Sequence, residues 1–439
     1  MASSSRPAAR LDVYWGAEHV GSVYDTQPLS FAYTSPWLKH TQAHAIAGIA
    51  LQPGLINSAA VASFFENLLP EGALRDYLAQ QKQASTLFWL LHKIVGDSAG
   101  GYVLMPGGHR PTPAHYEASS WQALAKALKT SPAIELGLKR RGTRISLAGA
   151  QDKLGIALFA DGIPRLPQGT AASTHILKPN IQHTARVWHS ATNETLIMLT
   201  AAHCGLPSAE VFYEPTTQSC VVRRYDRYEK TPGVIERLIQ YDFCQLAGLP
   251  SHGKYESEGG PGIADCAAII RHYSAQPAVD LKHFIVWIFF NLFVGNHDSH
   301  AKNLSIYQQR DGTVRLSPFY DLMSTRLYPG LSKQFALSVG GQTHPGALSK
   351  AHVQRMAQTL GMQPKFALAM ASTLSQSLPP ALSQAMRTLA PRLSPSARNL
   401  AMRLEQFVRS NTKKIAARLS LPNHSAKGDQ GQSSPPGKR

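Results

Sequence analysis

Two kinds of residue are scarce in this 439-residue chain: cysteine and acidic side chains. No CxxC pair occurs, so the sequence indicates neither a zinc site nor a disulfide framework. Aspartate and glutamate total 27 against 44 lysines and arginines, which gives a net charge of +17 and a pI near 9.8. A positive field of this size favours polyanionic partners, although the same charge would also serve solubility alone. The cysteines, expected to be buried and reduced, are Cys204, Cys220, Cys244 and Cys266.

Long apolar runs are lacking as well. The start of the chain, MASSSRPAARLDVYWG, has no apolar run after its arginines, and the most apolar segment, Phe284 to Val294, is too short to cross a bilayer. We therefore expect a cytoplasmic protein without a membrane partner. Its 43% hydrophobic content is typical of a soluble protein with several sizeable cores.

Local patterns divide the chain into parts. Residues 10–34 predict short strands, and residues 57–81 predict two helices around a Pro-Glu-Gly turn. After a Pro-rich exit near residue 112, strands dominate, with one helix for which Thr192 is the expected N-cap. Helical periodicity follows, including residues 235–248. The predicted domains are 1–112, 113–235 and 236–422, with a disordered tail at 423–439.

The segment GNHDSHAKN, residues 295–303, allows two interpretations. GNHD occurs in metal-dependent phosphoesterases, whose two metal ions lie about 4 Å apart and need many ligands. Such an enzyme requires an upstream Asp-x-His, but the only Asp-x-His here, Asp298 to His300, lies within the segment itself. The spacing of Asp298 and Asn303 is instead that of a protein-kinase catalytic loop.

A kinase also needs a phosphate loop, a lysine for the phosphates and a second metal ligand. Lys178 ends the predicted strand THILKP, and Glu194 follows on the next helix, where an ion-pair partner is expected. Asp321 in LSPFYDLMS supplies the second Mg²⁺ ligand beside Asn303, and Asp298 would accept the proton of the substrate hydroxyl. The phosphate loop would surround Gly149, although it is neither a Walker A nor a GxGxxG motif.

With these parts in order, the chain resembles the HipA family, the kinase toxins of bacterial type II toxin–antitoxin modules, from about residue 11 to 419. The resemblance implies an α+β, protein-kinase-like two-lobe fold, with a β-rich N-lobe, an all-helical C-lobe and an extra N-terminal β-rich subdomain. The motifs that carry it are FFENLLPEG (64–72), SLAGAQDK (146–153), THILKP (174–179), NETLIMLTAAHCGL (193–206), VVRRYDR (221–227), YDFCQLAG (241–248), KYESEGGPG (254–262), GNHDSHAKNLSIY (295–307) and LSPFYDLMS (316–324).

The resemblance also implies roles for individual residues. Asp298 would be catalytic, Asn303 and Asp321 would bind Mg²⁺, and Glu194 would pair with the ATP lysine. Ser146 matches the family's autophosphorylated serine, whose modification is thought to eject the phosphate loop and switch the kinase off; about −2 of added charge beside an ATP site fits that effect. The implied ATP-binding residues are Ala148, Gly149, Ala150, Gln151, Asp152, Lys153, Lys178, Arg223, Arg224, Tyr225, His300, Ala301, Lys302, Asn303, Tyr320 and Asp321.

Partners are implied in the same way. The family pairs with a small helix-turn-helix antitoxin (HipB-like), and the complex binds operator DNA and represses its own promoter. Its known substrates include aminoacyl-tRNA synthetases, notably the glutamate enzyme, whose phosphorylation arrests growth. Basic residues of the last helices suit a surface near DNA, or equally an ordinary solvated face; they are Arg398, Arg403, Arg409, Lys413, Lys414 and Arg418.

The chain departs from the family at two places. Gln240-Tyr241-Asp242 stands where Gln-Glu-Asp is frequent, and Arg223 begins the adenine hinge where an acidic or neutral residue is usual. The sequence thus predicts an ATP- and Mg²⁺-dependent serine/threonine kinase toxin. The alternative from another class is a catalytically silent scaffold that acts only as a co-repressor in a DNA-bound complex.

Overall fold

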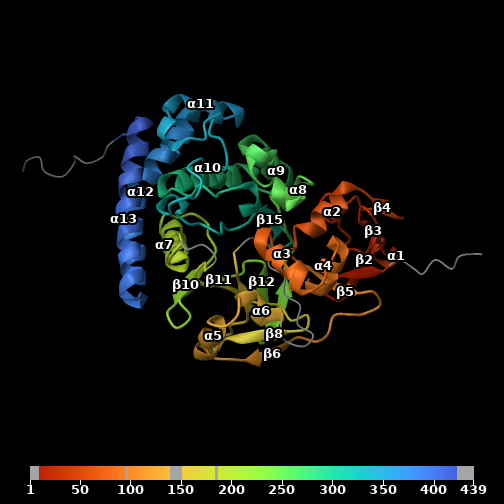
Figure 1. Cartoon of the computed structure of the whole chain (residues 1–439). Helices are drawn as coiled ribbons and strands as arrows, with labels where there is room; N and C mark the ends of the chain where they lie inside the picture. Colours follow the sequence, from red (N-terminus) through yellow and green to blue (C-terminus); the bar gives the residue numbers. More distant parts are fainter. Residues whose placement is uncertain (1–8, 95–96, 139–150, 183–185, 423–439) are drawn as a thin grey trace, which may run out of the picture.

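The N-terminal part is an antiparallel sheet covered by helices. This computed structural model describes residues 9–94, 97–138, 151–182 and 186–422 (Figure 1). Leu11, Val13 and Phe31 on the strands are fully buried in one core with Phe64 and Phe65 of a helix. The predicted strands and the two predicted helices are confirmed. In the sheet order β4-β3-β2-β1-β5, the elements are β1 (Arg10–Trp15), β2 (Glu18–Tyr24), β3 (Ser30–Tyr33), β4 (Ile56–Asn57), β5 (Tyr102–Pro106), α1 (Ser35–Leu38), α2 (Ala59–Glu66), α3 (Gly72–Gln81) and α4 (Leu87–Ile94).

A second antiparallel sheet has the order β10-β11-β9-β7, and its strands β10 and β11 are labelled in the lower half of Figure 1. Lys178 is the last residue of β9 and lies opposite Cys220 of β11. A smaller two-stranded sheet flanks it. The elements are β6 (His115–Ala118), β7 (Leu154–Ile156), β8 (Arg165–Gln168), β9 (His175–Lys178), β10 (Val211–Glu214), β11 (Ser219–Arg223), α5 (Trp121–Leu128), α6 (Ala133–Leu138) and α7 (Ser190–His203).

The N-cap of helix α7 is His189, three residues before the predicted N-cap Thr192. His189 is in the left-handed conformation, with φ of 51°, and its own side chain makes no capping hydrogen bond. The side chain of Asn180 accepts the hydrogen bond from the backbone N–H of Ala191 instead, at 3.1 Å. A cap supplied from eleven residues upstream leaves no local signal, which is why the sequence misplaced the helix start.

The C-terminal part is mostly helical, but the prediction of a helix over residues 235–248 is wrong. This stretch forms a strand of a hairpin, a strand paired with the distant Ser305–Gln308, and only then a short helix. The prediction of an all-helical C-lobe is therefore corrected, because this part also contains the three-stranded sheet β14-β15-β16. The elements are β12 (Arg227–Thr231), β13 (Val234–Arg237), β14 (Gln240–Asp242), β15 (Ser305–Gln308), β16 (Val314–Leu316), α8 (Phe243–Leu246), α9 (Ile263–Tyr273), α10 (Pro277–Val294), α11 (Lys350–Thr359), α12 (Pro364–Leu389) and α13 (Pro395–Arg418).

Helix α10 is the centre of the C-terminal core. It contacts α9, α12 and α13, and most of its residues are buried, among them Trp287, Phe289 and Phe293. By length and composition it could span a membrane, yet 61% of it is buried inside the protein. Its apolar residues therefore serve as a rigid support for the loop that follows Val294.

Candidate active site

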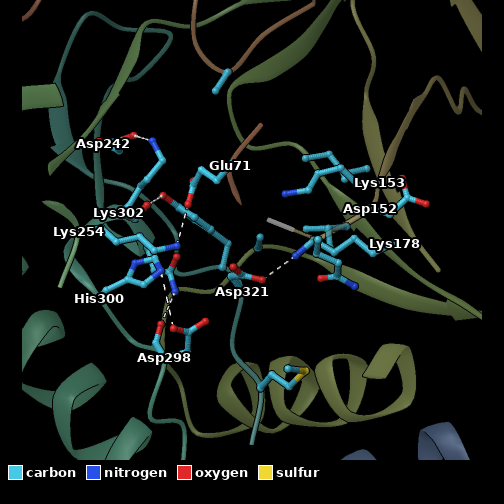
Figure 2. Close-up of a pocket in the computed structure, with 18 of the residues that line it drawn as sticks. Glu71, Asp152, Lys153, Lys178, Asp242, Lys254, Asp298, His300, Lys302 and Asp321 are labelled. Atoms are coloured by element: carbon cyan, nitrogen blue, oxygen red, sulfur yellow. Dashed lines mark hydrogen bonds and ion pairs between the residues drawn. The ribbon is translucent and has the colours of Figure 1, made fainter. Parts of the chain in front are cut away.

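A cavity of about 720 Å³ lies where the N-terminal part, the second sheet and the helical part meet. Most of the residues with predicted roles line it. Figure 2 shows Lys153 and Lys178 on one side, Asp298, His300 and Lys302 on the other, and Asp321 between them. The N-terminal part lines the cavity as well, through residues of α3 and of the turn before it.

Lys178 bridges two carboxylates in this cavity. Its Nζ donates to Glu194 Oε1 of α7 at 2.6 Å and to Asp321 Oδ1 at 2.8 Å. Burial alone would lower the pKa of Lys178, but the two carboxylates outweigh it and raise the pKa above its usual value. Burial alone would raise the pKa of Asp321. The positive charges of Lys178 and Lys153 outweigh this effect and hold the pKa of that carboxyl well below its ordinary range. Lys178 is therefore a fixed cation and Asp321 a fixed anion at neutral pH.

Lys153 lies on the same side of the cavity and is the second cation there. Burial and the charge of Lys178 lower the pKa of Lys153 to about 8. Its neighbour Asp152 also lines the cavity, but both oxygens of its carboxylate are engaged. It accepts hydrogen bonds from the backbone N–H groups of Ala133 (2.6 Å) and Ile134 (2.9 Å), at the first turn of α6.

Hydrogen bonds shape the loop after α10. Gly295 ends that helix with φ of 70°, and a Cβ there would lie 2.8 Å from the ring of Phe407, so only glycine fits. The backbone N–H of Asp298 donates to Asn296 Oδ1 at 3.1 Å, and Asn303 Nδ2 donates to the backbone oxygen of Asp298 at 3.0 Å. The predicted catalytic aspartate and the predicted metal ligand are thus held together.

Asp298 lies at the wall of the cavity with 54% of its side chain exposed. Burial by its surroundings raises the pKa of its carboxyl, whereas the hydrogen bond from Tyr255 Oη, at 2.6 Å, lowers it. His300 Nε2 lies 4.0 Å from Asp298 Oδ1. Burial and the nearby Lys254 lower the pKa of His300 to about 3, so the imidazole is neutral at physiological pH.

The adenine hinge predicted at residues 223–225 lines the cavity, but its side chains have separate environments. Arg223 is exposed and pairs with Glu210 at 2.8 Å. Arg224 is buried, and its guanidinium is held by Asp226 and by Asp97 from the N-terminal part. Tyr225 stacks on Tyr320, whose ring centroid lies 5.9 Å away.

Other predicted residues have different surroundings. Ala301 packs into the hydrophobic core. Lys302 lines the cavity, but its ammonium group is engaged by Asp242 (2.6 Å). Gln151 lies at the cavity edge and donates to the backbone oxygen of Pro179 at 3.3 Å. Ser146 and Ala148 to Ala150 lie outside the described residues.

Sequence reasoning assigned no role to Asn67, Glu71 and Lys254, which line the cavity, or to Tyr255, which contacts Asp298. Lys254 donates to Glu71 Oε2 at 2.7 Å, and Tyr255 bonds to Asp298. The signal was present, because these residues lie in the motifs FFENLLPEG and KYESEGGPG. What the sequence could not show was that the two motifs meet at the catalytic loop.

The oxygen atoms available in the cavity suit Mg²⁺. Asn303 donates through its nitrogen, which leaves its Oδ1 free to bind a cation, and the side chain of Asp321 is 45% exposed. Mg²⁺ is usually held by one or two such oxygens together with substrate phosphates. In the described part of the chain no three His, Cys, Asp or Glu side chains form a metal site, so the many ligands of a two-metal phosphoesterase are not found there.

Comparison with known proteins places the chain in a family. Residues 145–382, more than half of the chain, match the HipA-like C-terminal domain, and residues 11–103 match the HipA N-terminal domain. The chain belongs to the HipA family.

Individual relatives agree with this membership of the HipA family. The putative kinase Y4mE of Sinorhizobium fredii is 37% identical over 75% of this chain and 80% of its own length. The serine/threonine-protein kinase toxin HipA of Shewanella oneidensis is 26% identical over 87% of this chain and 90% of its own. A solved complex of Shewanella HipA, HipB and operator DNA contains a chain with a TM-score of 0.79 and 21% identity, covering 94% of this chain and all of that one. The α+β, kinase-like HipA fold predicted from the sequence is confirmed.

Proposed function

We propose that this HipA-family protein is an ATP- and Mg²⁺-dependent serine/threonine protein kinase that acts as the toxin of a toxin–antitoxin module. One observation carries the proposal: Lys178, bridged to Glu194 and Asp321, faces Asp298 and Asn303 across a single cavity. These are the charges that phosphoryl transfer needs, because the protein contributes mainly positioning and electrostatic stabilisation. The names of the kinase relatives support the same class.

In the proposed reaction, bound Mg²⁺-ATP supplies the phosphoryl group and neutralises part of its charge. Lys178 and Lys153 would hold the phosphates, with Glu194 keeping Lys178 extended toward them. Asn303 and Asp321 would hold the metal through oxygen atoms. Asp298 would orient the serine or threonine hydroxyl and take its proton on a carboxylate oxygen.

The partners belong to the proposal too. A helix-turn-helix antitoxin and operator DNA are supported by the Shewanella HipA, HipB and operator DNA complex. Along α13 the charge is suitable, since Arg398, Arg403, Lys413, Lys414 and Arg418 are exposed. The proposed substrate is an aminoacyl-tRNA synthetase such as the glutamate enzyme, phosphorylated in the cytoplasm to arrest growth. Autophosphorylation of Ser146 would switch the kinase off.

The decisive experiment is intact-mass and phosphopeptide analysis after incubation of the dephosphorylated protein with Mg²⁺-ATP, beside an Asp298→Asn control. We expect an added phosphate on Ser146 that is missing from the control. A protein that binds ATP but gains no phosphate, on itself or on a synthetase substrate, would instead be a silent co-repressor, tested by operator binding together with the antitoxin.

A further inference from the structure

The hydroxyl group of Tyr255 contacts Asp298 directly. Its Oη donates to Asp298 Oδ1 at 2.6 Å, and its ring meets the His300 ring edge to face with centroids 5.1 Å apart. Tyr255 lies between two short 3₁₀ turns, Ser251–Gly253 and Glu256–Glu258. A short segment with little regular structure does not fix the position of a side chain by itself, so the position of Tyr255 depends on contacts with the surrounding protein.

The N-terminal domain fixes this segment at two points. The buried carboxylate of Glu66 accepts hydrogen bonds from Ser251, from the backbone N–H at 2.8 Å and from Oγ at 2.7 Å. Glu71, also buried, accepts from Lys254 Nζ at 2.7 Å. Figure 2 shows Glu71 and Lys254 on the same side of the cavity as His300 and Asp298. Charge-assisted bonds of this kind are shorter and about twice as strong as neutral ones.

The segment is anchored on its far side as well. The carboxylate of Glu256 accepts from Ser338 Oγ at 2.6 Å, and it belongs to the turn immediately after Tyr255. Both neighbours of Tyr255 in the sequence are therefore held in place: Lys254 is bonded to the N-terminal domain, and Glu256 is bonded to the helical part.

We propose that Tyr255 is a positioning residue for the carboxylate of Asp298, and that the N-terminal domain holds it in place through Glu66 and Glu71. The inference rests on the proposed kinase function. Tyr255 occupies only Oδ1 of the carboxylate, and the side chain of Asp298 is still 54% exposed, so Oδ2 is left for the hydroxyl of the protein substrate. Fixing one oxygen restricts rotation of the carboxylate and aims the other at the acceptor.

A different role for the same contact would give the opposite kinetics. If the phenol occupied the place of the substrate hydroxyl, its removal would open the site and speed phosphoryl transfer. The free second oxygen argues against competition, because substrate and phenol can bind Asp298 together.

The test compares Tyr255→Phe with wild type in steady-state phosphorylation of glutamyl-tRNA synthetase, the proposed substrate, with Tyr273→Phe on α9 as a matched control. Loss of one hydrogen bond to a charged group predicts a fall in kcat of about 10- to 100-fold. The KM for ATP should stay unchanged, because the phenol contacts Asp298, which acts on the hydroxyl of the protein substrate and not on ATP. Tyr273→Phe should match wild type. Equal thermal melting of the variants would show that the fall is not caused by unfolding.

Glu71→Gln supplies a second, independent variant. It keeps the shape of the anchor but removes its charge, so kcat should fall by a smaller factor, again without a change in the KM for ATP. In the double variant with Tyr255→Phe, the total fall in kcat should be smaller than the product of the two separate falls, because both substitutions act through one segment.

The outcomes separate the inference from the function on which it rests. Wild-type activity that is lost in Asp298→Asn but unchanged or increased in Tyr255→Phe would overturn the inference and leave the kinase function standing. Fully multiplicative effects of Glu71→Gln and Tyr255→Phe would overturn the role of the N-terminal domain. Wild-type protein that binds ATP but transfers no phosphate would overturn the proposed function itself.

Discussion

Lys302 of the catalytic loop donates a hydrogen bond to Asn67 Oδ1 of the N-terminal domain at 2.6 Å. The same ammonium group pairs with Asp242 at 2.6 Å, so one buried cation joins the N-terminal domain, β14 and the loop that carries Asp298. The side-chain nitrogen of Asn67 also donates to the backbone oxygen of Leu249 at 2.8 Å. The N-terminal domain is therefore a structural component of the active-site wall.

Asn67→Ala should destabilise the protein because the buried ammonium group of Lys302 loses one of its two side-chain partners and keeps only Asp242. We expect the free energy of unfolding to fall by about 1.5–3 kcal/mol, measured by urea denaturation. Asn57→Ala, at an exposed position on β4, is the matched control and should change stability by less than about 0.5 kcal/mol. Equal midpoints for the two variants would contradict the importance of the Asn67 to Lys302 bond.

Lys178→Met should abolish most phosphoryl transfer. The substitution removes the cation between Glu194 and Asp321 while keeping a side chain of similar length. Loss of one preorganised charge contact to the reacting group reduces rates by about 10²- to 10³-fold. The measurement is the rate of phosphate incorporation, with Lys365→Met on the exposed face of α12 as control. A variant as active as this control would show that Lys178 has only a structural role.

Much of the fold could be predicted from local pattern. The strand before Lys178 and the helix that carries Glu194 have clear periodicities, and the structure brings these two side chains to 2.6 Å. The helix predicted over residues 235–248 is wrong for a physical reason. The helical periodicity of these residues is only a weak local preference. Strand β14 gains its hydrogen bonds from β15, some 60 residues further along the chain, and no local pattern shows this pairing.

The contacts between domains could not be predicted either. Glu66 and Asn67 look like ordinary polar residues at the end of a helix, yet they hold segments about 185 and 235 residues away. Their partners depend on how the N-terminal domain docks, which is a property of complementary surfaces rather than of sequence spacing. The domain boundaries at residues 112 and 235 stay a prediction.

Asp97→Asn should destabilise the connection between the N-terminal domain and the hinge. The carboxylate is fully buried and lies within 3.4 Å of Arg224, 3.0 Å of Arg227 and 3.2 Å of Arg237. Neutralising it leaves buried guanidinium groups undercompensated, which costs about 3–5 kcal/mol in the free energy of unfolding. Urea denaturation should show this loss, whereas Asp76→Asn, exposed on α3, should behave as wild type. A fall in the free energy of unfolding below about 1 kcal/mol would mean that the other contacts of these arginines, such as those with Asp226, are enough to stabilise them.

His300 should make the stability of the protein depend on pH. Its pKa is lowered to about 3 in the folded protein by burial and by the charge of Lys254, against 6.5 in the unfolded chain. Between these values the unfolded chain binds a proton that the folded protein does not, so the free energy of unfolding rises with pH and this contribution is complete above pH 6.5. His300→Gln should therefore reduce the slope by up to about 1.4 kcal/mol per pH unit.

Urea denaturation at several pH values from about 4.5 to 7.5 would measure that slope for His300→Gln, with His344→Gln, at an exposed loop position, as control. The other groups that titrate in this range, such as the half-buried His175, are present in every variant, so their contributions cancel in the comparison. Parallel pH profiles for wild type and His300→Gln would mean that the folded protein protonates this imidazole readily. In that case His300 would carry a positive charge beside Asp298, and the site would hold one more cation than the neutral imidazole described above.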